Sequence, residues 1–177
     1  MESFNKGAFS MDKLLIPISY EEFKSKVSIR FNNIEEGFNR YENKILTGKE
    51  EAMEKFLYEA IKLNGTENSF VDFYYENLDE ESKKRVFEML GEEGRRLLTK
   101  FIEGSKSKEV YYNITLESVP LICELNFKEI LFSTFYFTRI PLTIWGNYEK
   151  RFPCFYEEKR NLQDYIKLIE KCGATLE

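Results

Sequence analysis

The chain has no histidine among its 177 residues. Histidine changes charge near neutral pH, which makes it the most frequent general acid–base group in enzymes and a common ligand of transition metals. Its absence excludes every catalytic mechanism and every metal site that needs an imidazole. We therefore expect a domain that folds and works without a metal and without a cofactor.

Cysteine is scarce as well. The three cysteines, Cys123, Cys154 and Cys172, are odd in number, lie far apart and form no C-x-x-C pair. Disulfide-stabilised domains and zinc sites usually carry paired cysteines at short spacings, so the pattern predicts buried free thiols. Nucleophilic catalysis by Cys154 would need an activating base, and without histidine that base would be Lys150, Glu157 or a tyrosine.

Long apolar runs are also missing. No stretch approaches the ~20 apolar residues that cross a bilayer, and residues 1–13 show no basic segment followed by a long apolar run. The sequence therefore predicts a cytoplasmic protein that does not enter a membrane. The glycine-rich phosphate-binding patterns G-x-x-x-x-G-K and G-x-G-x-x-G do not occur either.

Aromatic residues and acidic charge are what the chain does contain. It has 16 Phe, 11 Tyr and 1 Trp, and its formal net charge is −5. Residues 12–104 hold 20 acidic and 15 basic side chains, whereas residues 105–177 hold 10 of each. An acidic surface repels nucleic acid and attracts basic proteins. We expect a basic protein partner and no nucleic acid; an acidic surface that is merely solvated is the alternative.

The first half of the chain shows the apolar spacing of amphipathic helices. Ser19 and Glu22 have the spacing of a capping box, and the apolar residues behind them predict one long helix over 19–45, weakened at Gly37. Further stripes predict helices over 47–64, 69–77, 79–90 and 92–103. In the last two helices we expect these apolar residues to be buried: Val86, Phe87, Leu90, Leu97, Leu98, Phe101 and Ile102.

After residue 104 the apolar spacing changes to the alternation that marks strands. The strands are predicted over 110–116, 130–138, 142–148 and 152–156, with 130–138 apolar on both faces like a central strand. Residues 119–128 fit a strand or a helix, and 158–173 predict a C-terminal packing helix. The sequence thus predicts one α+β domain over 1–177: a mainly helical half, 12–104, packed on an antiparallel sheet with a final C-terminal helix, 105–177.

Two acidic clusters lie at predicted helix starts. Glu80 and Glu81 open the helix over 79–90, and Glu92 and Glu93 open the next one. Carboxylates stabilise a helix N-terminus through its dipole, and clustered carboxylates also bind hard cations such as Mg²⁺. The first interpretation of these clusters is therefore that they stabilise helix starts. A surface that steers a partner and a metal site are the alternative interpretations.

The loop over 145–151 combines Trp145, Tyr148 and Arg151, residue types that are enriched in interface hot spots. Rings that fold back on the sheet are the structural alternative. We predict a non-enzymatic protein-binding module, such as an immunity protein or an antitoxin-like inhibitor of a basic, nucleic-acid-acting protein. In this hypothesis the four glutamates steer association and the loop supplies contact area. Two other functions stay open: a histidine-free enzyme, such as a carboxylate–metal hydrolase or a transferase, and a self-associating scaffold that forms homo-oligomers.

Overall fold

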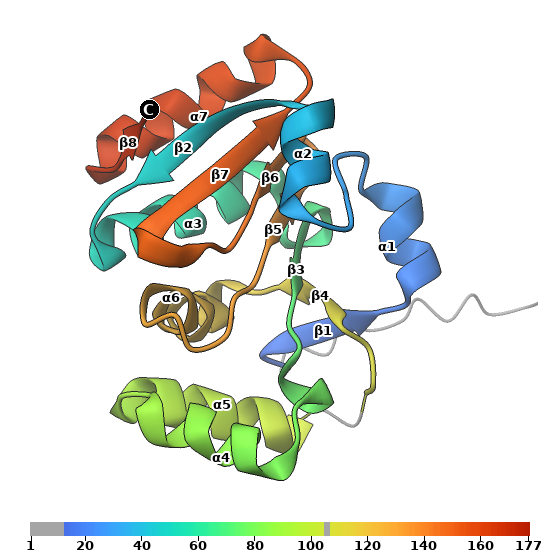
Figure 1. The fold of residues 1–177 in the computed structure, drawn as a ribbon, viewed down its shortest axis with the longest axis vertical. Helices are drawn as coiled ribbons and strands as arrows, with labels where there is room; N and C mark the ends of the chain where they lie inside the picture. Colours follow the sequence, from blue (N-terminus) through green and yellow to red (C-terminus); the bar gives the residue numbers. More distant parts are fainter. Residues whose placement is uncertain (1–12, 105–106) are drawn as a thin grey trace, which may run out of the picture.

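Eight strands form one antiparallel sheet in the computed structural model, which describes residues 13–104 and 107–177 (Figure 1). In chain order the strands are β1 (Leu15–Ile18), β2 (Glu42–Thr47), β3 (Ser69–Asp72), β4 (Tyr111–Ile114), β5 (Phe135–Phe137), β6 (Leu142–Ile144), β7 (Arg151–Tyr156) and β8 (Thr175–Leu176). The helices are α1 (Tyr20–Lys26), α2 (Ile34–Arg40), α3 (Glu50–Asn64), α4 (Glu80–Met89), α5 (Glu92–Gly104), α6 (Val119–Phe127) and α7 (Lys159–Cys172). The predicted α+β fold class is confirmed.

The strands are ordered β1-β4-β3-β5-β6-β7-β2-β8, and all neighbouring strands are antiparallel. β2 and β7 form the longest ladder, from Glu42 opposite Tyr156 to Thr47 opposite Arg151. Three strands, β1, β2 and β3, come from the first half of the chain. The half predicted to be mainly helical therefore contributes to the sheet as well.

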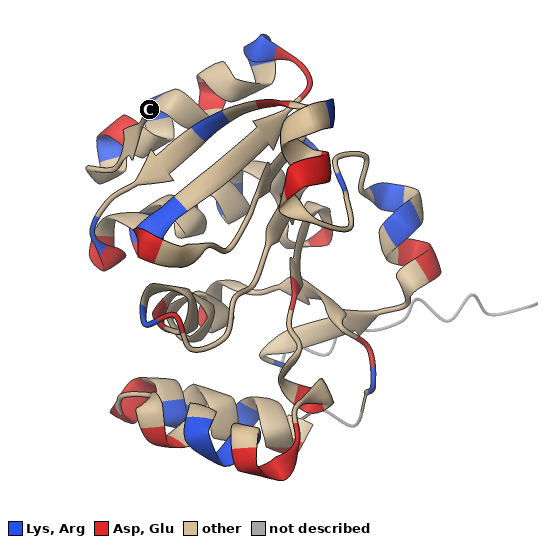
Figure 2. Ribbon diagram, in the orientation of Figure 1, with Lys and Arg blue, Asp and Glu red and all other residues tan. Residues whose placement is uncertain are grey.

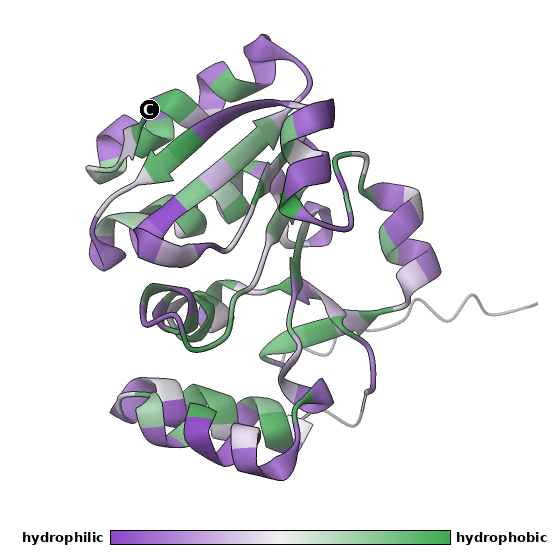
Figure 3. Ribbon diagram, viewed as in Figure 1, coloured by the Kyte–Doolittle hydropathy of each residue, from purple (hydrophilic) through white to green (hydrophobic). Residues whose placement is uncertain are grey.

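The main hydrophobic core lies between one face of the sheet and the helices α3, α5, α6 and α7. Because side chains alternate between the faces of a strand, Phe152 and Cys154 of β7 point into this core together with Phe135 and Phe137 of β5. α6 is the most deeply placed helix, with seven of its nine residues buried. Hydrophobic residues accordingly colour most of α6, whereas α4 and α7 are mixed (Figure 3).

The opposite face of the sheet carries α1 and α2, which stand apart from each other in Figure 1. Phe23 of α1 packs edge-on against Phe70 of β3 and Tyr136 of β5, with ring centroids 6.4 and 4.9 Å away. These rings form a second, smaller core with Ile18 and Val27. Two short helices cover less of a sheet than four long ones, and this difference between the two faces determines where a cavity can form.

α4 and α5 form a helix pair at the edge of the molecule, on the far side of α6 from most of the sheet (Figure 1). α5 packs on α6 and buries Leu97, Leu98 and Phe101. Within Glu80–Met89, Val86 is the one buried residue. α4 is therefore the outermost helix, and most of its surface faces solvent.

Many of the predicted elements are confirmed. The helices predicted over 79–90, 92–103 and 158–173 are α4, α5 and α7, and α3 matches the helix predicted to end at residue 64. β4 and β6 lie within predicted strands, and β7 matches the strand predicted over 152–156 but begins one residue earlier. Residues 119–128, which fitted a strand or a helix, form α6. The expectation for the start of the chain falls on residues 1–12, outside the described residues.

The long helix predicted over 19–45 is wrong. α1 ends early, residues 27–33 form a loop, α2 is only two turns long, and β2 follows it. A carbonyl of the loop is bound by a distant side chain, because Thr143 Oγ1 donates to Ile29 O at 2.7 Å. Asn33 then starts α2 anew as its N-cap.

The apolar spacing over 19–45 has a different cause from the one predicted. Phe31 in the loop and Phe38 in α2 pack on the same ring, Phe155 of β7, with centroids 4.8 and 5.3 Å away. Gly37 lets α2 approach closely, since a Cβ there would lie 2.8 Å from the Phe31 ring. The loop over 27–33 and α2 therefore both pack on Phe155, and their apolar residues together have the spacing of a single amphipathic helix.

The helix predicted over 69–77 is wrong as well. Its first four residues form β3, which pairs with both β4 and β5 and is buried at every position. Phe70 and Phe73 have helical spacing, yet they lie in the two different cores. The strand predicted over 130–138 is shortened to β5, because Ile130 N donates back to Leu125 O and continues the end of α6.

Candidate functional site

The four predicted glutamates lie in the first turns of α4 and α5. Asp79 caps α4 by accepting a hydrogen bond from Ser82 N at 2.7 Å. The glutamates in these first turns are Glu80, Glu81, Glu92 and Glu93. α4 has 10 residues. It is therefore about 15 Å long. The glutamates consequently form two clusters at the two ends of the helix pair, as Figure 2 shows.

Three of the four glutamates are neutralised by a basic residue of their own helix. The ion pairs are Glu80–Lys83, Glu81–Arg85 and Glu93–Arg96. A hydrogen bond from Arg96 lowers the pKa of Glu93. Glu92 forms no ion pair within residues 13–104 and 107–177. Residues 79–104 hold seven acidic and six basic side chains, so the charge of the helix pair is close to balanced.

An apolar groove of about 580 Å³ lies between α4 and α5. Phe87 and Ile102, which we expected to be buried, line it with Tyr75 and are 38 % and 42 % exposed. That expectation is wrong because α4 turns Val86, and not Phe87, toward the interior, and α5 buries Leu98 and Phe101 but not Ile102. Charged side chains complete the groove: Glu76, Glu80, Lys83, Lys84 and Glu88.

The three predicted contact residues of the loop over 145–151 lie in different environments. Trp145 is half-buried and stacks on Phe31, with ring centroids 5.2 Å apart and planes 24° apart. Tyr148 is 64 % exposed. Arg151 is exposed and pairs with Glu177 at 3.0 Å. Trp145 thus belongs partly to the packing of the sheet face, whereas Tyr148 is exposed and packs edge-on against Phe132 at 4.7 Å.

The loop is held against the end of α6. A Cβ at Gly146 would lie 2.5 Å from Ser133 O, so only glycine fits there. Glu149 N donates to Glu129 Oε1 at 2.6 Å. The junction of α4 and α5 lies against the same end of α6, because Gly91 N donates to Glu124 Oε1 at 2.7 Å.

These contacts bring the junction of α4 and α5 and the loop over 145–151 to the same end of α6. Glu80 and Glu81 lie at the other end of α4. The predicted site is therefore split, and the groove between α4 and α5 lies beside Glu80.

Sequence reasoning missed Asp72, the most deeply buried carboxylate of the sheet. Asp72 is 7 % exposed and accepts hydrogen bonds from Thr134 N at 2.7 Å and from the Tyr136 hydroxyl at 3.1 Å. Burial raises the pKa of Asp72 to about 7, although these hydrogen bonds favour its ionised form. The sequence feature that could have indicated this buried carboxylate is an aspartate within the apolar run 70–75.

The geometry gives little support to nucleophilic catalysis by Cys154 or to a metal site on clustered carboxylates. Cys154 is fully buried, and burial raises the pKa of its thiol far above neutral pH. Its thiol donates to Phe152 O, which suits a core residue. Across residues 13–104 and 107–177, no three Asp, Glu or Cys side chains are grouped as metal ligands.

Comparisons with protein-family models, with characterised proteins and with solved structures find no match to this chain. No helix in the described part of the chain has the length and apolarity needed to cross a bilayer.

Proposed function

We propose that the chain is a non-enzymatic protein-binding module that docks a basic protein through the groove between α4 and α5. The main support is the exposure of Phe87 and Ile102 in a groove whose charged side chains are three glutamates and two lysines. Apolar side chains that share a groove gain free energy when a partner removes them from water. The outermost position of α4 leaves the groove accessible to a large partner.

The glutamates contribute mainly to the choice of partner. Exposed ion pairs within a helix contribute little to stability, so a lysine or arginine of a partner can replace Lys83 or Arg85 at small cost. The net charge of −5 adds a weak attraction for basic proteins that is screened over about 8 Å at physiological salt. Apolar contact is thus the larger source of affinity, and charge the larger source of specificity.

The specific form of this proposal is a cytoplasmic inhibitor, an immunity protein or antitoxin that covers a basic, nucleic-acid-acting protein. Proteins that act on nucleic acid carry basic surfaces that bind phosphates, and carboxylates around an apolar contact complement such surfaces. Tyr148 at the neighbouring edge would extend the contact area beyond the groove.

The test is affinity capture from the native cell with three forms of the full chain as bait. Phe87→Glu places a charge in the groove, and Leu116→Glu is the matched control because Leu116 has the same 38 % exposure and lies outside the groove. We expect a basic protein that is captured by the wild-type and Leu116→Glu forms and lost with Phe87→Glu. Circular dichroism verifies that both variants fold.

Two results would redirect the proposal. If sedimentation shows a dimer that Phe87→Glu dissociates, the groove is a self-association surface and the scaffold alternative holds. If every captured protein binds both variants equally, the groove is not a docking site. For the captured basic protein, purified inhibitor should block its nucleic-acid activity, and Phe87→Glu should not.

A further inference from the structure

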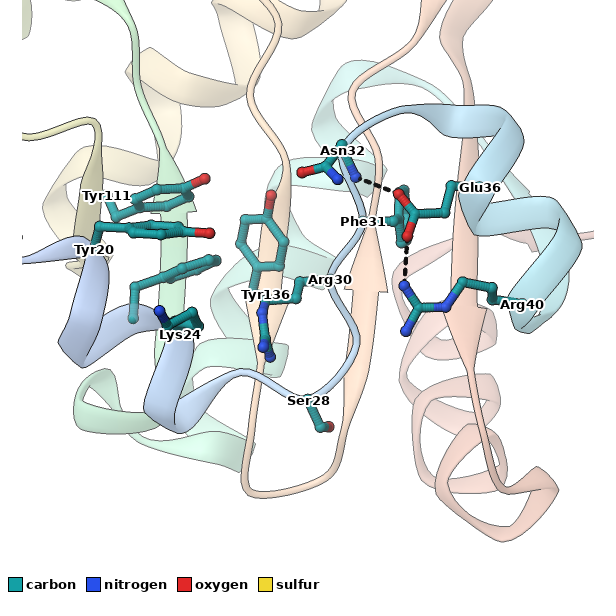
Figure 4. A pocket seen from close by; sticks show the side chains of 11 residues that line it. Tyr20, Lys24, Ser28, Arg30, Phe31, Asn32, Glu36, Arg40, Tyr111 and Tyr136 are labelled. Carbon is teal, nitrogen blue, oxygen red and sulfur yellow. Dashed lines mark hydrogen bonds and ion pairs between the residues drawn. The ribbon is translucent and has the colours of Figure 1, made fainter.

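A cavity of about 380 Å³ lies on the sheet face that carries α1 and α2 (Figure 4). Tyr111 of β4 and Tyr136 of β5 line it from the sheet, and the loop over 27–33 lines it between the two helices. The cavity exists because the chain breaks its helix at residue 27, so that neither α1 nor α2 covers this part of the sheet. It lies apart from the groove between α4 and α5, with which it shares no lining residue.

The charge of the cavity is opposite to that of the protein. Lys24, Arg30 and Arg40 line it together with one carboxylate, Glu36, whereas the whole chain carries −5. Figure 4 shows the charged ends of the three basic residues along one side of the view and the tyrosine hydroxyls along the other. Glu36 is already bound to Arg40 and to Asn32 N. Lys24 Nζ pairs with Glu21 Oε1 at 3.0 Å.

Arg30 is the best placed of the three cations. Its Nη1 donates to Val27 O at 2.6 Å, which fixes the guanidinium at the cavity. Across the described ranges, 13–104 and 107–177, Arg30 has no carboxylate at ion-pair distance. A half-buried arginine with free donors is suited to bind a phosphate or carboxylate group by two parallel hydrogen bonds.

Stacked aromatic rings form the wall beside these cations. Tyr111 stacks on Phe23 with centroids 3.8 Å apart, and Tyr20 stacks on Tyr111 at 5.9 Å. Tyr20 is 49 % exposed, so its ring keeps surface for a further planar group. Lys24 Nζ lies 5.3 Å from the centre of the Tyr20 ring, which joins the aromatic wall to the positive charge. Open aromatic rings beside basic side chains bind planar anionic groups by stacking and charge together.

We propose that this cavity binds a small anion that carries a planar ring, the class that mononucleotides represent. Arg30 binds the anionic group, and Tyr20 stacks on the ring. The volume of the cavity falls within the range of small-ligand sites. The cavity therefore gives the chain a small-molecule site in addition to the protein-binding groove.

The test is isothermal titration calorimetry of the purified full chain with AMP, GMP, CMP and UMP, and with inorganic phosphate and adenosine as half-ligands. We expect at least one mononucleotide to bind more tightly than either half-ligand. Arg30→Gln should weaken that binding by about tenfold or more, since it removes a charge-assisted hydrogen bond. Tyr20→Ala should weaken it by loss of stacking.

Arg160→Gln is the matched control, because Arg160 is exposed on α7 outside the cavity and should bind as the wild type does. The single tryptophan gives a second readout, since Trp145 stacks on Phe31, which lines the cavity. Absence of binding for all four mononucleotides at millimolar concentration, or equal binding by Arg30→Gln, overturns the proposal. Phosphate that binds as tightly as the mononucleotides overturns the role of the ring. Each of these results leaves the groove between α4 and α5 unaffected.

Discussion

Asp72 is a carboxylic acid in the interior of the sheet, and its protonation should make the stability of the protein depend on pH. Burial raises its pKa to about 7 in the folded chain. In the unfolded chain an aspartate titrates near 3.9. The folded state therefore holds the proton more strongly than the unfolded state between these two pKa values. The stabilisation is fully present below about pH 4 and is lost as the pH rises to about 7.

The size of the effect follows from the shift. A raised pKa of about three units corresponds to roughly 4 kcal/mol at 1.36 kcal/mol per unit, and roughly 2–3 kcal/mol of this is lost between pH 5 and pH 8. Asp72→Asn should remove this loss because an amide does not ionise. The asparagine keeps the local hydrogen bonds, since its Oδ1 accepts from Thr134 N and its amide donates to the Tyr136 hydroxyl oxygen.

The assay is urea denaturation of the wild type and Asp72→Asn at pH 5 and pH 8. The wild type should lose more unfolding free energy between the two pH values than the variant does, by the amount derived above. Asp164→Asn is the control, because Asp164 is exposed on α7 and its replacement should leave the pH dependence of the wild type unchanged. If Asp72→Asn and the wild type show the same pH dependence, Asp72 is ionised at pH 5 and the argument from burial fails.

Three further outcomes are expected. Phe135→Ala and Phe137→Ala, each at a ring that is 3 % exposed, should lower the unfolding free energy by about 3–5 kcal/mol in urea titrations, and near-native stability would contradict their place in the core. Changing the four helix-start glutamates (Glu80, Glu81, Glu92 and Glu93) to glutamine should slow association with a basic partner chiefly at low salt, as stopped-flow measurements at two salt concentrations would show. Thermal melting with and without a chelator should give the same midpoint, because the chain has no histidine and unpaired cysteines; a large decrease would reveal a structural metal.

The elements that sequence predicted well are those whose boundaries are set locally. α4 begins where Asp79 can cap it, and α7 ends where Gly173 adopts a left-handed conformation with φ +82. Both signals need only a few neighbouring residues, and the apolar stripes between them repeat at helical spacing. These features require no knowledge of the rest of the chain.

The elements that were not predicted from the sequence are stabilised by residues far away along the chain. β3 is a strand because it inserts between β4 and β5, some 40 and 65 residues further along the chain. The loop over 27–33 is stabilised by Thr143, 114 residues from the carbonyl that it binds. A four-residue apolar run, or apolar residues three and four positions apart, can occur in a helix, a strand or a loop. Strand pairing and burial in the folded chain determine which of these forms.

The candidate sites follow the same division. The acidic helix starts were visible in the sequence, but the groove depends on Phe87 and Ile102, whose spacing also suited a buried helix face. Arg30 and Tyr20 lay inside a helix that we predicted to be continuous, and in a continuous helix they line no cavity. The cavity became visible only with the break at residue 27.

The location of both sites follows from how the sheet is covered. On one face the helices α3, α5, α6 and α7 pack on the strands and form the main core, and the groove lies where α4 extends beyond that core. On the other face α1 and α2 leave a gap, and a gap over a sheet exposes rings such as Tyr111 that would otherwise be buried. In the cavity the Tyr20 ring keeps apolar surface in water, and Arg30 has no carboxylate partner among the described residues. A planar anion would cover the ring and pair with the arginine together, which is the physical basis of the ligand class that we propose for this cavity.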